Sequence, residues 1–468
     1  MRQATGMNLI RVMGATLALG AVGAAQDVRG LGMGGALVPG PSLAAFNPAY
    51  SVYPPDGRGG GLVLPLGLLN FFVNPQLNVF DFILNPARYA NPGDPNSPEF
   101  NALGAFDQAT HLNTFILNPV PAPQQINIDI SATGVSLSDQ NGTPLAYDFS
   151  SGAAVNVSSG ASSVGAAPLF RIPFGFGGLS IGAGLFVNFT GPSLAVNPEL
   201  QNDVIARGGT LTPDRNYENV VTGAVQGSVG ISLDAAYATA LEVPGATVYV
   251  GGRGAGFYGI ALVDATANVS VKADSSGEIR EAETTYEVTI FRADPTNGGF
   301  GFGVNLDLGV AADLPSATLG VPELEKLTVG LGVVGAVDTY SWSGQEQTIT
   351  ANGTSAPVAA TRGGFGFNPL VTLNAAGTFS LSGGWRVLAL ADVQFGRGVF
   401  RAHLGAEAQF GMVFVRTGLG FDNGLRFGLG AGLEVAPGLG FDLALTTHQA
   451  PFYNHTSFGI ALAARFGF

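Results

Sequence analysis

The chain has 468 residues, of which 11% are charged, 70 are Gly and 32 are Phe. Charged residues are about half as frequent as in ordinary soluble domains. Many apolar residues alternate with Gly instead of forming the runs of bulky aliphatics that a large soluble core needs. The formal net charge of -13 argues against nucleic-acid binding. The absence of Cys excludes a thiol nucleophile and a Cys-ligated metal.

The first 25 residues have the features of a secretory signal peptide. Arg2 and Arg11 precede an apolar run at 12–25 that ends in small residues, so we expect cleavage before Gln26. The run is only about fourteen residues long, which is too short for a membrane-spanning helix. Since no other uninterrupted apolar run is long enough, strands are the remaining way for this chain to cross a membrane.

The clearest strand pattern lies at the end of the chain, in residues 456–468. Large apolar residues such as Phe458, Ile460 and Leu462 alternate there with small or polar ones such as Arg465, so one face is apolar. About ten such residues can cross a bilayer as a tilted strand. Similar segments occur at 169–174, 179–189, 221–240, 246–263, 300–312, 326–340, 365–381, 385–395, 399–410, 412–421, 425–435 and 439–447. The sequence therefore predicts an all-β fold, a transmembrane antiparallel β-barrel.

The barrel is expected to occupy residues 59–468, with a candidate first strand at 62–73. Long connections of such barrels lie outside the cell and short turns inside, which predicts four outer loops at 74–164, 191–221, 264–298 and 342–364. This division gives about 14 strands. Alternating segments at 126–138 and 145–157 are either further strands, raising the number to about sixteen or eighteen, or hairpins within the first outer loop.

The segment after the signal peptide, residues 26–58, combines closely spaced glycines with an Asn-Pro-Ala motif. The residues are Gly30, Gly32, Gly34, Gly35, Asn47, Pro48 and Ala49. This opening resembles that of the FadL/TodX superfamily of outer-membrane transporters for hydrophobic compounds. The resemblance implies that residues 26–58 form a plug, or hatch, inside a 14-stranded barrel, that Asn47-Pro48-Ala49 is the plug motif, and that movement of the plug releases the cargo.

Two segments of the predicted loop at 74–164 have apolar residues at helical spacing. These residues are Leu77, Phe80, Ile83, Leu103 and Phe106. In the resembled superfamily such loops capture apolar ligands, which implies the same role for these short helices. An equally strong alternative is that they only cap the mouth of the barrel.

The C-terminal strands are regular enough to assign their faces. Large apolar residues from Phe400 to Leu445 are expected to face lipid. The opposite, lumen-facing positions hold His403 and most charges of this region: Arg401, Glu407, Arg416, Arg426, Glu434, Asp442 and Arg465. On the lipid face each Arg would cost roughly 2–4 kcal/mol near mid-membrane. The charges are therefore predicted to point into the barrel.

A two-residue turn at Gly411-Met412 would pair Phe410 with Val413 and fix the register of the two adjoining strands. Counting outward places Glu407 opposite Arg416, and the same register brings Arg401 opposite Asp422 inside the lumen. We expect these pairs to stiffen the wall and balance its charge rather than to select a cargo.

Two sequence motifs suggest enzymes but lack the required surroundings. Residues 30–35 satisfy G-x-G-x-x-G without a βαβ unit, and 178–182 satisfy G-x-S-x-G within an alternating strand. We therefore expect no catalytic activity, no cofactor and no metal site. The resemblance implies passive transport of hydrophobic or amphipathic molecules, such as long-chain fatty acids, across the outer membrane of a diderm bacterium.

Relatives of this superfamily with roles in secretion leave a second hypothesis open, a non-transport barrel that acts as a scaffold or secretion partner. The expected partners are outer-membrane lipid and a hydrophobic small-molecule ligand or detergent. No nucleic acid is expected, and the protein is expected to be a monomer.

Overall fold

The computed structural model describes residues 28–54, 61–64, 66–77, 108, 113–117, 119, 126–131, 134–146, 153–158, 170–173, 178–367, 369–396, 399–422, 424–436, 439–450, 453 and 455–466. The predicted signal peptide lies outside the described residues. None of the helices in these ranges is long and apolar enough to cross a membrane.

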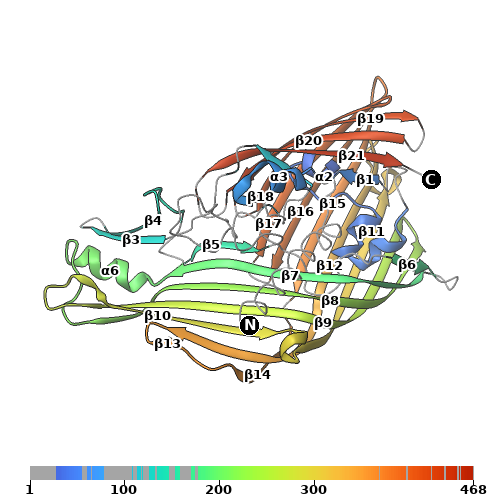
Figure 1. The fold of residues 1–468 in the computed structure, drawn as a ribbon. Coiled ribbons are helices and arrows are strands. Elements are labelled where there is room, and N and C mark those ends of the chain that lie inside the picture. The colour runs from blue at the N-terminus through green and yellow to red at the C-terminus, as the bar shows by residue number, and fades with distance from the viewer. Residues whose placement is uncertain are drawn as a thin grey trace.

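The wall of the molecule is one antiparallel sheet of 19 strands that curves around a central space (Figure 1). Its strands are β1 Gly61–Leu64, β2 Phe115–Leu117, β5 Ala153–Ser158, β6 Phe170–Pro173, β7 Leu179–Val196, β8 Asn216–Val243, β9 Ala246–Ala273, β10 Ile279–Ala293, β11 Phe300–Pro315, β12 Leu324–Thr350, β13 Gly353–Thr354, β14 Val358–Gly366, β15 Leu370–Leu381, β16 Trp385–Gly396, β17 Val399–Phe410, β18 Val413–Asp422, β19 Leu425–Ala436, β20 Leu439–Gln449 and β21 Thr456–Phe466. The predicted all-β barrel fold is confirmed.

Four positions in this wall are each filled by two strands that lie end to end along one neighbour. β1 and β2 both pair with β21, and β5 and β6 both pair with β7. β10 and β11 both pair with β9, while β14 and β15 both pair with β12. With the two-residue β13 set aside, the described strands fill 14 positions. No described pairing joins β1 or β2 to β5 or β6, so the predicted number of crossings stays a prediction.

The candidate first strand at 62–73 is wrong over most of its length. β1 ends at Leu64, and a short helix, α3 Leu68–Val73, follows, with the 3-10 turn η3 Pro75–Leu77 after it. Contiguous apolar residues lack the two-residue alternation of a half-buried strand, and such a run does not distinguish helix from strand. Asn70 in α3 is buried, and its amide donates to Gln108 and to the carbonyl of Ile116 in β2.

One side of the barrel is far longer than the other. β8 and β9 have 28 residues each, whereas β18 has 10 and β20 has 11. At about 3.3 Å per residue, 28 residues span roughly 90 Å, against a bilayer core of about 30 Å. In Figure 1 these strands continue to the left, together with β10, β13 and β14, beyond the ends of β17–β21.

Two predicted outer loops are therefore wrong as loops, because the structure forms strands there. Most of 264–298 belongs to β9 and β10, and most of 342–364 belongs to β12 and β14. The pattern was hidden because the outer face of a strand beyond the membrane meets water, so polar residues such as Thr, Ser and Asn stand where a membrane strand has apolar ones. The predicted loop at 191–221 keeps its polar connection but contains β7 up to Val196, a helix, and the start of β8.

That helix, α6 Pro198–Ala206, belongs to a small cap on the extended side. Pro198 stands at its first turn, and the side chain of Asn197 accepts from the N–H of Glu199 at 2.9 Å. Its apolar side packs on the far ends of β8 and β9. The buried cluster consists of Leu200, Val204, Leu211, Tyr217, Val220, Val271 and Ala273.

A separate hairpin lies next to α6. β3 Ile126–Ser131 and β4 Gly134–Asp139 form their own two-stranded sheet, so the segment 126–138 is a hairpin and not a wall strand. The segment 145–157, also left open, contributes β5 to the wall. Asp139 accepts a 3.0 Å hydrogen bond from the hydroxyl of Tyr453, which lies between β20 and β21. The hairpin therefore contacts both α6 and the β20–β21 connection.

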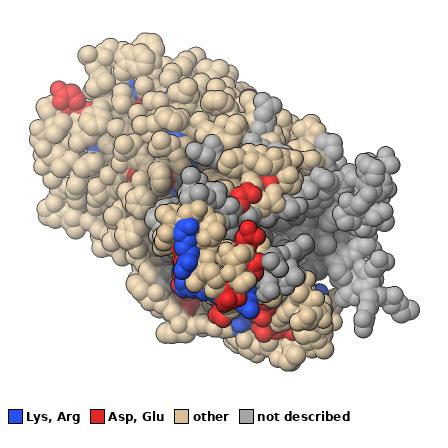
Figure 2. All heavy atoms as spheres, turned by 90° about the vertical axis from the view of Figure 1, so that its left-hand side faces the viewer, with Lys and Arg blue, Asp and Glu red and all other residues tan. Residues whose placement is uncertain are grey.

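The outer faces of β17–β20 carry a continuous apolar band. Nearly all side chains predicted to face lipid are exposed: Phe400, Leu404, Phe410, Val413, Val415, Leu419, Phe421, Leu425, Phe427, Leu429, Leu433, Phe441, Leu443 and Leu445. Aromatic pairs border the band, with Trp385 and Phe410 at one end and Phe400 and Phe421 at the other. Figure 2 shows charged side chains gathered on part of the extended end and little charge on the rest of the visible surface. The band defines the membrane-facing zone.

Candidate functional site

The N-terminal residues 28–54 lie inside the curved wall (Figure 1) and are called the plug below. They contain α2 Val28–Gly32 and two 3-10 turns, η1 Pro41–Ala45 and η2 Pro48–Val52. α2 packs against β18–β21, and η2 packs against β8, β9 and β11. The plug therefore contacts opposite parts of the wall, and the side chains that hold it are the candidate functional residues.

Arg29 links the plug to the wall through a row of buried charges. It donates to both carboxylate oxygens of Glu407 on β17, with Nε–Oε2 2.9 Å and Nη2–Oε1 2.8 Å. Glu407 also accepts from Nε of Arg416 at 2.6 Å, and Nη1 of Arg416 donates to Asp442 at 2.6 Å. Nε of Arg465 lies 2.6 Å from the other oxygen of Asp442. The five side chains alternate in charge from the plug to β21.

The register predicted for β17 and β18 is confirmed. Glu407 pairs with Arg416, and Arg401 pairs with Asp422. Nε of Arg401 donates to Asp422 at 2.8 Å. The turn residue Gly411 has φ +57°, as expected for the first central position of a two-residue hairpin whose second residue has negative φ.

The remaining lumen positions bind the wall to itself and to the plug. Arg426 lies 3.5 Å from the second oxygen of Asp422. Asp392 contacts Nδ1 of His403 at 2.7 Å and accepts from the backbone N–H of Leu37 in the plug at 2.8 Å. Glu434 is half-buried beside the β17–β18 turn, where its N–H donates to the carbonyl of Met412.

The plug glycines lie where its backbone meets the backbone of the wall. Gly34 has φ +73°, and a Cβ there would lie 2.7 Å from backbone atoms of Gly418 and Leu419. A Cβ on Gly32 would lie 3.0 Å from Cα of Gly430. Gly30 and Gly35 make the turn after α2 possible, since Gly35 has φ +94° and a Cβ on Gly30 would meet the carbonyl of Ala36 at 2.8 Å. Glycine on both surfaces lets the two backbones pack without a gap.

The Asn-Pro-Ala motif forms the start of η2 and is buried against β11. The Asn47 side chain accepts from the N–H of Ala49 at 3.1 Å and donates to the carbonyl of Val310 at 3.0 Å. Pro48 fills the first position of the turn, where no N–H donor is needed. The wall has Gly251 next to this motif, and a Cβ there would lie 2.6 Å from the Ala49 nitrogen. In this arrangement the motif caps and anchors the turn.

Sequence reasoning missed a second group of contacts, which join the plug to β9, β11, β12 and β15. The side chains involved are Tyr50, Tyr53, Arg253, Asp307, Asp313, Lys326 and Asn374. Asn374 donates to the hydroxyl of Tyr50 at 2.7 Å, the hydroxyl of Tyr53 donates to Asp313 at 2.9 Å, and Lys326 donates to the Tyr53 hydroxyl at 2.8 Å. Arg253 donates to Asp307 at 2.7 Å and to the carbonyl of Ala45 at 3.3 Å.

One signal could have found part of this group. In 300–312 the apolar residues Phe302, Val304, Leu306 and Leu308 alternate with Asn305 and Asp307, which predicts that the polar pair faces the lumen. The partners are hundreds of residues away in the sequence, and nothing in the linear order pairs Tyr53 with Asp313. These contacts could not be predicted from the sequence for that reason.

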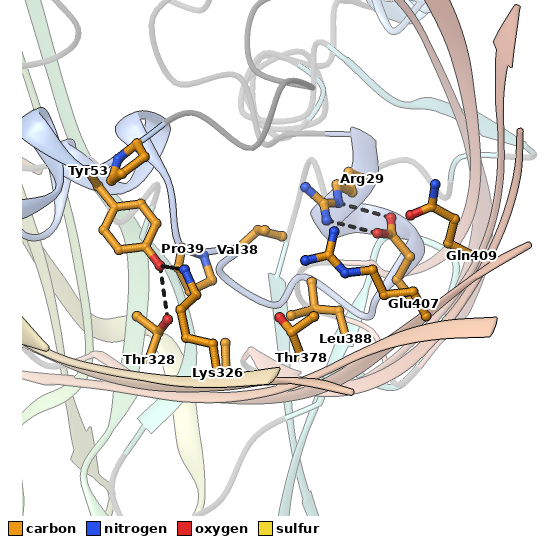
Figure 3. Close-up of a pocket in the computed structure, with 13 residues that line it drawn as sticks. Arg29, Val38, Pro39, Tyr53, Lys326, Thr328, Thr378, Leu388, Glu407 and Gln409 are labelled. Atoms are coloured by element: carbon orange, nitrogen blue, oxygen red, sulfur yellow. Dashed lines mark hydrogen bonds and ion pairs between the residues drawn. The ribbon is translucent and has the colours of Figure 1, made fainter. Parts of the chain in front are cut away.

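A cavity of about 230 Å³ remains between the plug and the wall, on the side of β12, β15, β16 and β17. Its lining is Arg29, Val38, Pro39, Tyr53, Pro54, Lys326, Thr328, Ala376, Thr378, Arg386, Leu388, Glu407 and Gln409. Figure 3 shows Tyr53 and Lys326 at one end and Arg29 with Glu407 at the other, above the strands of the wall. The lining thus combines five apolar side chains with three cations, one acid and four uncharged polar side chains.

The predicted loop-helix residues are mostly outside the described residues. Leu77 is buried at the end of η3. Phe80, Ile83, Leu103 and Phe106 all lie outside the described ranges, so their role in ligand capture stays a prediction. Within those ranges, no group of three or more His, Asp and Glu side chains is arranged to hold a metal ion.

The fold defines the chain as an antiparallel β-barrel of the outer-membrane type, and residues 28–54 pack against the inner side of its wall. No protein-family profile and no curated protein sequence matches it. Among solved structures it is similar to engineered variants of the porin from Rhodopseudomonas blastica. Two of them are each 12% identical, with a TM-score of 0.21, covering 54% of this chain and 96% of the porin chain. At this TM-score the likeness assigns neither a function nor a substrate.

Proposed function

We propose that this protein is a passive outer-membrane transporter for hydrophobic or amphipathic small molecules. The observation that carries the proposal is the cavity between plug and wall, where Val38, Pro39 and Leu388 provide an apolar surface next to cationic groups. The remaining lining residues are mostly polar or charged, and a lining that joins an apolar surface to placed polar groups suits a molecule with an apolar part and a polar head. The apolar band on β17–β20 supports a location in the outer membrane, the setting in which such barrels occur.

The plug distinguishes this proposal from a pore for polar solutes. Porins leave a water-filled channel through the barrel, whereas here the plug packs against β8, β9, β11 and β18–β21. A small cavity with an apolar surface favours single molecules that lose their water on entry over bulk solution. Long-chain fatty acids are a natural first test, since they combine an apolar chain with one polar head.

The proposal is tested by reconstituting the protein in liposomes and measuring uptake of a fluorescent long-chain fatty acid. We expect uptake above that of empty liposomes, which account for passive flip-flop. Entry of a disaccharide of similar mass should not exceed that background. Equal fatty-acid uptake with and without the protein would refute transport of this class, and rapid disaccharide entry would point instead to a polar pore.

A second candidate function is supported by the anchoring of the plug. The buried charges from Arg29 to Arg465 and the Asn47 contacts favour a lumen that stays sealed, as in a barrel that serves as a scaffold or secretion partner. That function predicts no uptake of fatty acid or disaccharide. It also predicts that a stable protein partner co-purifies from native membranes in stoichiometric amount.

A further inference from the structure

We infer that the cargo leaves through the cavity beside the plug while the plug stays in place, and that this cavity takes the anionic head group of an amphiphile. The inference rests on the proposed transport function and specifies its last step. It differs from the plug movement that the sequence resemblance implies.

The plug is held at both of its ends and along its glycine-rich turn. Arg29 is fixed by two hydrogen bonds to Glu407, and the N–H of Leu37 by Asp392. At the other end, Tyr53 donates to Asp313. Between them, Gly34 lies directly on the backbone of β18. Moving the plug as a body would break all these contacts together, including a buried ion pair.

The cavity lies between the plug and the wall, with the Arg29–Glu407 contact at one end and the Tyr53–Lys326 contact at the other. It is bounded by Val38, Pro39 and Tyr53 of the plug and by Thr378 and Leu388 of the wall (Figure 3). These wall residues lie close to the short β15–β16 and β17–β18 turns, the end of the barrel that faces the periplasm. A molecule that passes here reaches the periplasm without displacing α2 or η2.

The charge of the lining favours an anionic head group. Arg29, Lys326 and Arg386 all line the cavity, whereas Asp313 and Glu325, the acidic partners of the last two, do not. The side chains of Lys326 and Arg386 are 40% and 54% exposed. Both oxygens of the lining acid Glu407 are already bonded to arginines. The three cations are also paired, but Lys326 and Arg386 keep exposed surface that an entering carboxylate can contact.

A disulfide lock separates a fixed plug from a moving one, because the chain contains no Cys of its own. The double variant Ala36→Cys and Gly405→Cys joins the plug to β17, where the two Cβ positions lie 3.1 Å apart. Disulfides need about 3.8 Å, and a Cβ at position 405 would also lie 2.8 Å from Cβ of Met33, so the plug must shift slightly to accept the bond. A second lock, Val28→Cys with Ala444→Cys, joins the plug to β20 within one buried cluster and replaces the first if that one does not fold.

Uptake of the fluorescent fatty acid is compared for each lock in its oxidised and reduced states. We expect equal uptake in both, with the single Cys variants as controls. Loss of uptake on oxidation that returns on reduction would overturn the inference, because it would show that the plug must move.

Filling the cavity tests the route itself. Leu388→Trp fills it from the wall, while the matched control Val387→Trp places the same ring on the outer face of the same strand. We expect Leu388→Trp to lose most of the uptake and Val387→Trp to keep it. Full uptake in Leu388→Trp would overturn the route while leaving the transport function intact, whereas absence of uptake in the unmodified protein would refute transport itself.

The head-group assignment is tested with Arg386→Gln and two probes of equal chain length, the fatty acid and the corresponding alcohol. We expect slower uptake of the acid and unchanged uptake of the alcohol. An equal effect on both probes, or on neither, would refute selection of an anionic head group by this residue.

Discussion

Arg29 and Glu407 form a two-bond ion pair across 378 positions of sequence, with both side chains at most 10% exposed. The pair joins the first helix of the plug to β17 of the wall. Glu407 is shared with Arg416, so one carboxylate holds the guanidinium groups of the plug and of β18 together. A charge of the plug, Arg29, therefore helps to compensate the buried charges of the wall.

Replacing Glu407 with Ala should therefore destabilise the protein strongly, because two buried guanidinium groups lose a shared partner. Breaking a buried pair from one side costs about 3–5 kcal/mol, and we expect a loss of this size in the free energy of unfolding, measured by urea titration in lipid vesicles. The matched control is Arg386→Ala, which breaks the exposed pair with Glu325 and should cost less than about 1 kcal/mol. Similar losses in the two variants would contradict the role of Glu407.

Gly34→Ala should weaken the packing of the glycine-rich turn of the plug against β18. Its φ of +73° is unfavourable for a residue with a Cβ, and the added atom would lie 2.7 Å from the backbone of Gly418 and Leu419. The left-handed conformation alone costs roughly 1–2 kcal/mol. We expect faster amide hydrogen exchange in residues 28–37. Gly40→Ala is the control, because Gly40 has φ 165° and nothing within 4 Å of its Cβ position; faster exchange there as well would argue against a specific seat.

Leu429→Arg should show that the outer face of β19 lies in lipid. Leu429 is 59% exposed and pairs with Thr417 near the middle of β18, and an Arg at mid-membrane costs about 2–4 kcal/mol. The control is Leu425→Arg at the start of β19, beside Phe421, where the cost near the interface is about 0–1 kcal/mol. Equal unfolding free energies for the two variants in vesicles would contradict the assigned position of the membrane.

The cap around α6 should weaken in acid. Burial raises the pKa of Asp203, but hydrogen bonds from Tyr217 and Thr212, together with Arg207, hold that pKa below its usual value. A lowered folded-state pKa means that the ionised carboxylate stabilises the cap above the unfolded value of about 3.9 and that this stabilisation is lost as the pH falls below it.

Hydrogen exchange of residues 198–217, corrected for intrinsic rates, should therefore rise between about pH 5 and pH 3. In Asp203→Asn the same residues should exchange faster at pH 5 and change little on acidification. A pH response as large in Asp203→Asn as in the unmodified protein would assign the effect to another group.

The sequence predicted the part of the fold that lies in the membrane. From residue 385 onward the predicted strands match β16–β21 almost residue for residue, because lipid on one side and the lumen on the other impose a strict alternation of apolar and polar residues. The Glu407–Arg416 and Arg401–Asp422 pairs followed from the same alternation and a two-residue turn. Beyond the membrane this constraint is absent, and the extensions of β9, β10, β12 and β14 were mistaken for loops.

The site was predicted only in part. Gly34 and Asn47 stood out in the sequence because a glycine cluster and an Asn-Pro-Ala motif are recognisable locally. Tyr53, Asp313 and Lys326 did not, since their contacts join residues more than 250 positions apart.

Alternation along each strand thus determined, from the sequence alone, that this chain builds a barrel with an apolar outside and a charged lumen. Only the tertiary structure decided how the plug is seated, which wall strands hold it and where a cavity remains beside it. The physical reason is that alternation is set by the immediate surroundings of each strand. The Arg29–Glu407 pair, the glycine contacts and the cavity depend on distances between segments that the linear order does not contain.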